Sequence, residues 1–231
     1  YKHSGLVGRA TYNYIRRASV LADDVLLQDG NQWAIENTGQ LGGIEGADVS
    51  ASQAWDIVRE APEVIVAILD SGIRYTHEDL AANMWVNAAE IPGNGLDDDS
   101  NGYIDDVHGI NTVGINGERT AETEGDPMDD LGHGTHVAGI VGAVGNNGLG
   151  VTGVVWKVKL MALKFLDSQG EGSDADAIEC INYAREHGVH IINSSWGGLD
   201  FNPLLGDAIA EANAAGIYFV AAAGNESSNN D

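Results

Sequence analysis

The stretch that decides the fold is Asp-Leu-Gly-His-Gly-Thr-His-Val-Ala-Gly-Ile-Val-Gly-Ala, at positions 130–143. After its two histidines every residue is small or aliphatic, which predicts a helix buried on all sides. Gly132 and Gly134 flank His133 and carry no side chain, so we expect a substrate backbone to approach its imidazole. Because an imidazole transfers protons well near neutral pH, His133 is a candidate general base. His136, one turn further in, is expected to be a structural histidine.

A run of six aliphatic residues at positions 64–69 predicts a short buried strand that ends at Asp70. Functional groups in open α/β sheets collect beyond the carboxyl ends of the strands. Asp70 is placed there to orient an imidazole, although a single aspartate at a strand end is more often a turn former or a helix cap. Residues 216–225 repeat this pattern, and the amide of Asn225 can donate a hydrogen bond to a developing oxyanion.

The rest of the chain alternates between strand and helix patterns. We predict strands at residues 158–165, 189–195 and 217–222, and helices at residues 174–187 and 204–215. Residues 48–59 predict a further helix with Ala54, Trp55 and Val58 facing inward. The alternation predicts an α/β fold, with a doubly wound, mostly parallel central sheet and helices on both faces. The polar residues that would meet at one edge of this sheet are Asp70, Ser195 and Asn225.

Three motifs occur in the order Asp-Ser-Gly (70–72), His-Gly-Thr-His-Val-Ala-Gly (133–139) and Ala-Ala-Gly-Asn (222–225). Together they resemble the subtilisin family of serine proteases, from about Gln32 to the last residue. In that family the aspartate orients the histidine, the histidine is the general base, and the asparagine binds the oxyanion. The resemblance implies these roles for Asp70, His133 and Asn225, and it implies a secreted endopeptidase.

The family's nucleophilic serine lies in a Gly-Thr-Ser-Met-Ala motif, which occurs nowhere in these 231 residues. We therefore expect a catalytic domain without its C-terminal part, inactive alone, with polypeptide substrates and the missing C-terminal fragment as partners. The alternative is a protease-like binding protein or pseudoenzyme, although the retention of Asp70, His133 and Asn225 argues against it. A metallohydrolase is disfavoured because the zincin motif needs histidines four residues apart with an adjacent glutamate.

Two further segments resemble those with which the family binds substrates as added β-strands, Gly170-Glu171-Gly172 and Ser195-Trp196-Gly197. Their backbone amides and carbonyls would bind an extended peptide with little regard to its sequence. Glu171 would favour a basic substrate side chain, but in so acidic a chain an exposed glutamate more often has no such role.

An acidic loop at residues 97–106 has the pattern D-x-D-x-N-G that opens a calcium-binding loop. The candidate ligands are Asp97, Asp99, Asn101, Tyr103 through its carbonyl, and Asp105 or Asp106 in place of the usual glutamate. Five aspartates within ten residues would repel one another, which favours a bound Ca²⁺ over a solvated turn. A second acidic loop, residues 126–130, either completes a cation site or shapes the cleft.

The resemblance implies another Ca²⁺ in the glycine-rich loop after the long helix. In the family this ion is held by an asparagine side chain, loop carbonyls and an aspartate that follows Asp-Ser-Gly. The matching residues are Asp79, Asn147, Leu149 and Val151, with Val144 or Gly145 as a further carbonyl donor. The alternative is a simple glycine-rich turn.

Residues 1–30 differ from the rest and are expected to form an N-terminal extension, with the partial catalytic domain at residues 31–231. Within the extension, Asn13-Tyr14-Ile15 resembles the end of an inhibitory propeptide, which would make the protein a zymogen. The alternative is an ordinary extension.

The composition limits the partners of the protein. Eleven basic and 35 acidic residues give a net charge of -24, so the chain would repel the phosphates of nucleic acid. Its one cysteine, Cys180, excludes an internal disulfide. No stretch is apolar enough to span a membrane and no signal peptide is evident, so we expect no membrane partner; the targeting segment was removed or this N-terminus is internal.

Overall fold

The computed structural model describes residues 21–114, 119–121, 123–198 and 201–225, and five parallel strands of this part form one sheet in the order β2-β3-β1-β4-β5. The strands are β1 (Glu60–Asp70), β2 (Gly109–Asn111), β3 (Lys157–Lys164), β4 (Ile191–Ser194) and β5 (Tyr218–Ala221). The longer helices are α3 (His133–Gly142), α4 (Asp174–Glu186) and α5 (Pro203–Ala214). The short ones are α1 (Val25–Gln28), α2 (Ala51–Ala54), η1 (Gln40–Gly42) and η2 (Ala81–Asn83). The predicted α/β fold with a parallel sheet is confirmed.

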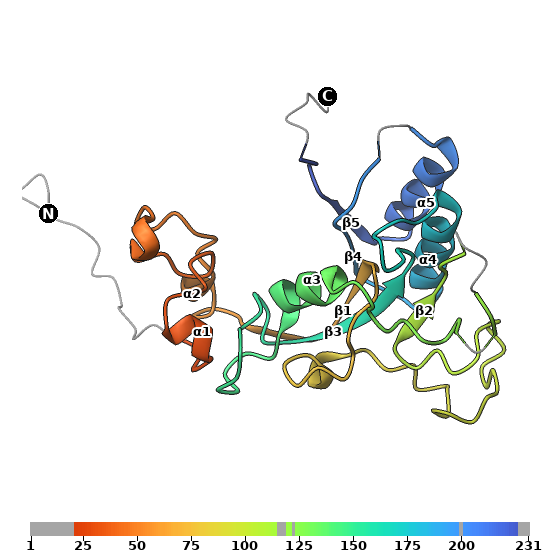
Figure 1. Ribbon diagram of the computed structural model, residues 1–231, viewed down its shortest axis with the longest axis horizontal. Coiled ribbons are helices and arrows are strands. Elements are labelled where there is room, and N and C mark those ends of the chain that lie inside the picture. Colours follow the sequence, from red (N-terminus) through yellow and green to blue (C-terminus); the bar gives the residue numbers. More distant parts are fainter. Residues whose placement is uncertain (1–20, 115–118, 122, 199–200, 226–231) are drawn as a thin grey trace, which may run out of the picture.

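Side chains of β1 alternate between two hydrophobic clusters on opposite faces of the sheet. Ala67 and Leu69 join a cluster that contains buried residues of α4 and α5. Val66 and Ile68 join a second cluster that contains Ala138 of α3. Helices therefore cover both faces, with α4 and α5 packed side by side (Figure 1).

A third cluster lies at the amino ends of β1 and β3, where α1 and α2 are found at the opposite end of the molecule from α4 and α5 (Figure 1). Its buried members are Ala22, Leu27, Ile35, Ala51, Trp55 and Trp156. Residues 22 and 27, of the expected N-terminal extension, thus pack against residues of the expected catalytic domain. The expected propeptide end, Asn13-Tyr14-Ile15, lies outside the described residues.

The prediction of a helix over residues 48–59 is wrong except for one turn, because α2 comprises only the four residues Ala51–Ala54. Its start is fixed by the carboxylate of Asp48, which accepts the N–H of Ser50. Trp55 is buried as expected, but Ala54 and Val58 are exposed. The β-branched residues that follow Trp55 favour extended backbone, and the chain enters β1 soon afterwards.

The prediction that the helix after His133 is buried on all sides is also wrong. Gly134, Ala138 and Gly142 face the sheet, and a Cβ on Gly142 would lie 2.5 Å from Cγ1 of Val158. Small residues at this spacing let α3 lie close to the strands along one stripe only. The outer face carries Ile140, which is 56% exposed, and His136, which is exposed rather than structural. This face lines a hollow of about 700 Å³.

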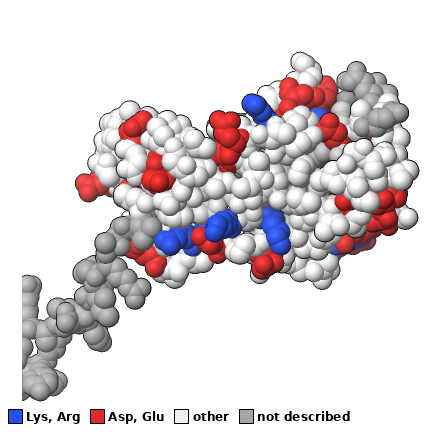
Figure 2. All heavy atoms as spheres, turned by 90° about the horizontal axis from the view of Figure 1, so that it is seen from below, with Lys and Arg blue, Asp and Glu red and all other residues white. Residues whose placement is uncertain are grey.

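The surface reflects the acidic composition. Figure 2 shows Asp and Glu side chains spread over one face, with Lys and Arg at a few positions between them. Among the described residues, no helix has the length and hydropathy needed to cross a membrane.

Candidate active site

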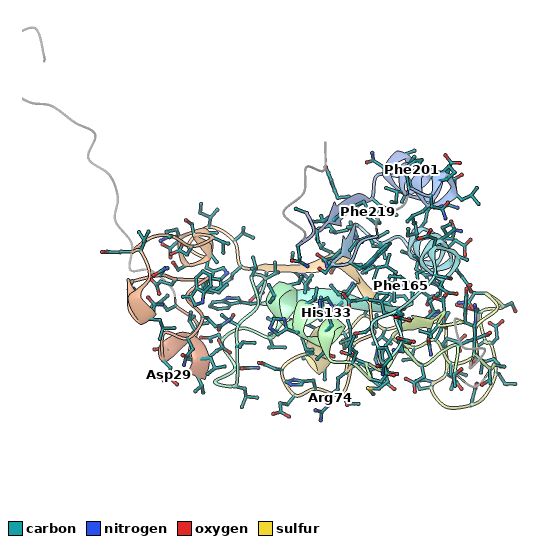
Figure 3. The ribbon with its side chains drawn as sticks, turned by 45° about the horizontal axis from the view of Figure 1, so that its top comes forward. Asp29, Arg74, His133, Phe165, Phe201 and Phe219 are labelled. Carbon is teal, nitrogen blue, oxygen red and sulfur yellow. The ribbon has the colours of Figure 1, made fainter. Side chains whose placement is uncertain are left out.

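Asp70 and His133 are in direct contact at the carboxyl end of β1. Oδ1 of Asp70 lies 2.7 Å from Nδ1 of His133 and also accepts the backbone N–H of Ser71. The Asp70 side chain is fully buried, whereas that of His133 is 48% exposed at the start of α3 (Figure 3). Because Nδ1 faces a carboxylate, it carries the ring proton, and Nε2 remains as the proton acceptor.

A glycine allows this contact. A Cβ on Gly134 would lie 2.1 Å from the carbonyl oxygen of Gly72 and 3.1 Å from Cβ of Asp70. The missing side chain of Gly134 thus makes room for the backbone of Gly72. Gly132 has a φ of 98°, a conformation that favours glycine at the turn into α3.

Asp129 organises the turn before α3. Its Oδ1 accepts hydrogen bonds from the hydroxyl of Ser71 and the N–H of Gly132, and its Oδ2 accepts the N–H and hydroxyl of Thr135. Burial acts to raise the pKa of Asp129, but these hydrogen bonds, with that from the Thr135 hydroxyl foremost, outweigh burial and lower the pKa. Asp129 of the acidic loop thus fixes the turn that leads into α3. The sequence analysis did not single out this residue, although an aspartate just before a helix is a common cap.

The segment Gly170-Glu171-Gly172 follows β3 through a tight turn. The carboxylate of Asp167 accepts the N–H groups of Gln169 and Glu171, and these hydrogen bonds lower the pKa of Asp167. A Cβ on Gly172 would lie 2.3 Å from the carbonyl oxygen of Phe165, so the segment passes close to the end of the strand. Gly170 and Glu171 are exposed and able to meet a ligand.

The segment Ser195-Trp196-Gly197 follows β4. The indole N–H of Trp196 donates to the carbonyl of Leu69 over 3.0 Å, and Ser195 Oγ accepts from Asn193. The rings of Trp196 and Phe165 are in contact, with centroids 4.7 Å apart. Phe165 contacts Trp196 and also lies close to Gly172, so it lies between the two segments expected to bind substrate.

Asn225 follows β5 at the same edge of the sheet as Asp70. Strand β4 lies between β1 and β5, so two strand spacings separate the two residues along the edge. The N–H of Ala222 donates to the carbonyl of Ser194, which continues the β4–β5 pairing toward Asn225.

Three carboxylates meet in the loops before β2. Glu90, Asp99 and Asp106 each present an oxygen, and these oxygens lie within 4.8 Å of one another. Asn87 donates to Asp99 and to Asp106 over 3.0 Å each, and Asn101 donates to Asp106 over 2.8 Å. Burial raises the pKa of Glu90. This set of oxygens suits a hard cation, and it includes Glu90, which the loop pattern did not indicate.

Two other carboxylates predicted as ligands of this loop accept backbone N–H groups. Asp97 accepts those of Asn101 and Gly102, and Asp105 accepts those of residues 93–95. Tyr103 is expected to offer its carbonyl, and its hydroxyl donates to Glu179 of α4. Of the two alternatives at positions 105 and 106, the structure brings Asp106 to the cluster.

The predicted ligands of the second loop surround a buried aspartate, Asp79. These residues are Val144, Asn147, Leu149 and Val151. Asn147 turns its amide nitrogen toward Asp79, at 2.8 Å, so hydrogen bonds close this loop. The structure adds Asp24, which is fully buried and accepts the N–H of Asn146. Burial raises the pKa of Asp24, and no local sequence pattern indicated this contact.

Comparison with known proteins gives the family. A model of the subtilase family matches residues 61–231. The chain belongs to the subtilase family. It is 42% identical over 161 residues to subtilisin-like protease 1 of Plasmodium vivax, and 32% identical over 177 residues to thermitase of Thermoactinomyces vulgaris. A third relative, the cell wall-associated protease of Bacillus subtilis, is 33% identical over 180 residues.

The alignment with the Plasmodium vivax protein covers 69% of this subtilase chain, and each of the other two covers 77%. The aligned part makes up 24% of the Plasmodium protein, 52% of thermitase and 17% of the Bacillus protease. The chain thus spans a quarter of the length of the Plasmodium vivax relative and about half of thermitase. The expected resemblance to serine proteases of the subtilisin type is confirmed.

Proposed function

We propose that this chain supplies the Asp, His and oxyanion-binding residues of a secreted subtilisin-type endopeptidase, which hydrolyses peptide bonds by acyl transfer. Asp70 orients His133, Nε2 of His133 takes the proton of the nucleophilic serine, and Asn225 donates to the oxyanion. The observation that carries this proposal is the 2.7 Å contact between the buried Asp70 carboxylate and the half-exposed His133 ring. A base held in this way is typical of acyl transfer.

In this proposal the serine comes from a segment outside the given sequence, because the Gly-Thr-Ser-Met-Ala motif is absent. An extended substrate binds between Gly170-Glu171-Gly172 and Ser195-Trp196-Gly197 as an added strand. The position of Phe165, in contact with Trp196 and close to Gly172, supports this arrangement, since it brings the two segments to the same end of the sheet. The N-terminal extension contains the end of the propeptide.

Calcium is the proposed structural cofactor. Glu90, Asp99 and Asp106 would hold one ion, and the closeness of their oxygens supports this assignment. An ion there would neutralise three carboxylates and fix the loop to the core. By family resemblance, Asp79 and Asn147 would hold a second ion with the carbonyls of the same loop.

The absent serine motif favours one other candidate, a protease-like binding protein without catalytic activity. Fluorophosphonate labelling separates the two. We expect the 231-residue chain alone not to react, and a longer protein that includes the downstream serine motif to label and to cleave peptides. In that protein, His133→Ala should remove nearly all turnover, whereas His190→Ala, at an exposed histidine, should not.

Stoichiometric labelling of the 231-residue chain alone would place the nucleophile within it and contradict the proposal. A folded longer protein that neither labels nor cleaves peptides would favour the binding protein.

A further inference from the structure

Lys164, the last residue of β3, is a buried cation with a complete set of acceptors. It is 4% exposed, and its Nζ donates to the carbonyls of Ser71 and Leu166, at 2.9 Å each, and to Oδ1 of Asp130, at 2.6 Å. An ammonium has three N–H donors, and here each has one acceptor. In the parallel register Lys164 is opposite Asp70, so its side chain reaches past the ends of the two strands.

The three acceptors belong to three segments of the proposed active site. Ser71 follows Asp70, which contacts His133. Asp130 lies in the turn that leads into His133 and α3. Leu166 begins the connection from β3 to the exposed 170–172 segment. The Lys164 ammonium therefore connects the turn after Asp70, the turn that leads into His133, and the segment that continues to residues 170–172.

Lys164 lies in an apolar stretch of the sequence, because Leu163, Phe165 and Leu166 are apolar and buried. Burial of a lysine is unfavourable unless its charge is paired and its donors are used, and an apolar residue of similar volume is often at least as stabilising. An apolar side chain could not form the three hydrogen bonds that the Lys164 ammonium donates.

Lys164 also contributes to the charges near His133. Asp130 pairs with the ammonium directly, and its side chain is 53% exposed. The other charged groups around this edge are Asp70, Asp129 and Asp167, the last of which has its pKa lowered mainly by backbone N–H groups and partly by Lys164. The ammonium of Lys164 is thus one positive charge among four carboxylates at this edge of the sheet.

We infer that Lys164 is a positioning residue, whose ammonium holds the Asp70–Ser71 turn, the turn of His133 and the 170–172 segment at a fixed spacing. The inference rests on the proposed function. Its removal should misalign the base and the bound peptide without removing the backbone groups that bind the peptide. A displacement of about 1 Å can reduce turnover about a hundredfold.

The test compares Lys164→Met with Lys159→Met in the longer enzyme. Lys159 lies on the same strand, with an exposed ion pair to Glu63. We expect Lys164→Met to lower kcat by roughly 10- to 100-fold and to change KM by less than about threefold, and Lys159→Met to change neither. Native kcat and KM in a folded Lys164→Met enzyme would overturn the inference.

A second measurement uses the 231-residue chain itself and needs no activity. The ring signals of His133 are compared by NMR in the native chain, in Lys164→Met, in Asp130→Asn and in the control Lys159→Met. They should shift in Lys164→Met and in Asp130→Asn, because the turn that carries His133 moves relative to Asp70, and they should stay unchanged in Lys159→Met. Unchanged signals in folded Lys164→Met and Asp130→Asn would overturn the inference, and Asp130→Asn alone tests it if Lys164→Met does not fold.

The two failures are distinguishable. If the longer protein cleaves no peptide, the proposed function fails, while the NMR comparison of the 231-residue chain still tests Lys164. If the longer protein cleaves peptides, and Lys164→Met and Asp130→Asn do not differ from native, only the inference fails.

Discussion

The hydroxyl of Tyr183 donates a 2.6 Å hydrogen bond to Oδ2 of Asp106, and both side chains are buried. Burial and the nearby carboxylate raise the pKa of Tyr183 well above its ordinary range, so the hydroxyl stays a donor at any physiological pH. Tyr183 lies on α4, which packs on the sheet. The Tyr183 side chain therefore connects the acidic cluster to the core.

Tyr183→Phe should destabilise the protein, because it leaves a buried carboxylate oxygen with one donor fewer. The expected loss is about 1–3 kcal/mol in the free energy of unfolding, measured by urea denaturation. The matched control is Tyr218→Phe, at a tyrosine that is 73% exposed, and it should change the midpoint little. Equal effects of the two substitutions would show that the hydrogen bond to Asp106 contributes no stability.

Removal of calcium should lower the melting temperature. An ion that binds only the folded state stabilises it by about 2.7 kcal/mol at a hundredfold excess over Kd, which corresponds to a shift of several degrees. Excess chelator should also increase proteolytic cleavage near Asp99. A melting curve that is the same with and without chelator would contradict the proposed cofactor.

The location of the ion can be tested with three variants of the acidic loops. Glu90→Gln and Asp106→Asn should reduce the shift caused by chelator, because each removes a charged ligand of the cluster. Asp98→Asn is the control, since Asp98 is exposed and accepts from Ile91 and Asn94 outside the cluster. A smaller shift in Asp98→Asn alone would place the ion elsewhere.

Asp129 should make stability depend on pH in the acid range. Because its folded pKa lies below the ordinary value, its hydrogen bonds contribute stability above the unfolded pKa of about 3.9, and this contribution is lost as pH falls through the folded pKa. The difference in unfolding free energy between native protein and Asp129→Asn should be largest above about pH 4 and shrink below it. Unfolding measured from neutral to acid pH checks this, and a difference that is constant across the range would contradict it.

Asn225→Ala tests the oxyanion role in the longer enzyme. The amide of Asn225 would act only when negative charge develops on the substrate, so its loss should lower kcat with little effect on KM. The expected decrease is about 10²–10³-fold, a magnitude taken from the corresponding asparagine of subtilisin. A similar change in kcat and KM would instead point to a role in substrate binding.

The regular elements could be predicted because their patterns are local. The aliphatic run at positions 64–69 lies within β1, and α4 begins at Asp174 as expected, with Ser173 and Asp176 forming a capping box. Strand β2 was missed because three residues are too few to show a period. The contact between Asp70 and His133 was anticipated from the position of Asp70 at a strand end and from the order of the motifs.

The unpredicted parts of the site depend on contacts between distant segments. Glu90 and Asp24 reach their partners through loop closures that no neighbouring residue signals. Lys164 gave one local signal, a charge at the end of an apolar strand. Burial of α3 was overestimated because small apolar residues allow close packing but do not determine how many elements cover a helix.

Gly134→Ala should break the approach of α3 to β1. The added Cβ would lie 2.1 Å from the carbonyl oxygen of Gly72, so the helix must move away from the strand that carries Asp70. We expect a loss of about 1–3 kcal/mol in the free energy of unfolding and a longer separation between Asp70 and His133, visible as changed NMR signals of the His133 ring. Gly139→Ala, on the same helix, is the control: its Cβ would meet nothing within 4 Å, and higher helix propensity should leave stability equal or raised by up to about 1 kcal/mol. Equal stability of the two variants would show that α3 can shift without cost, and that Gly134 does not set the distance between the two side chains.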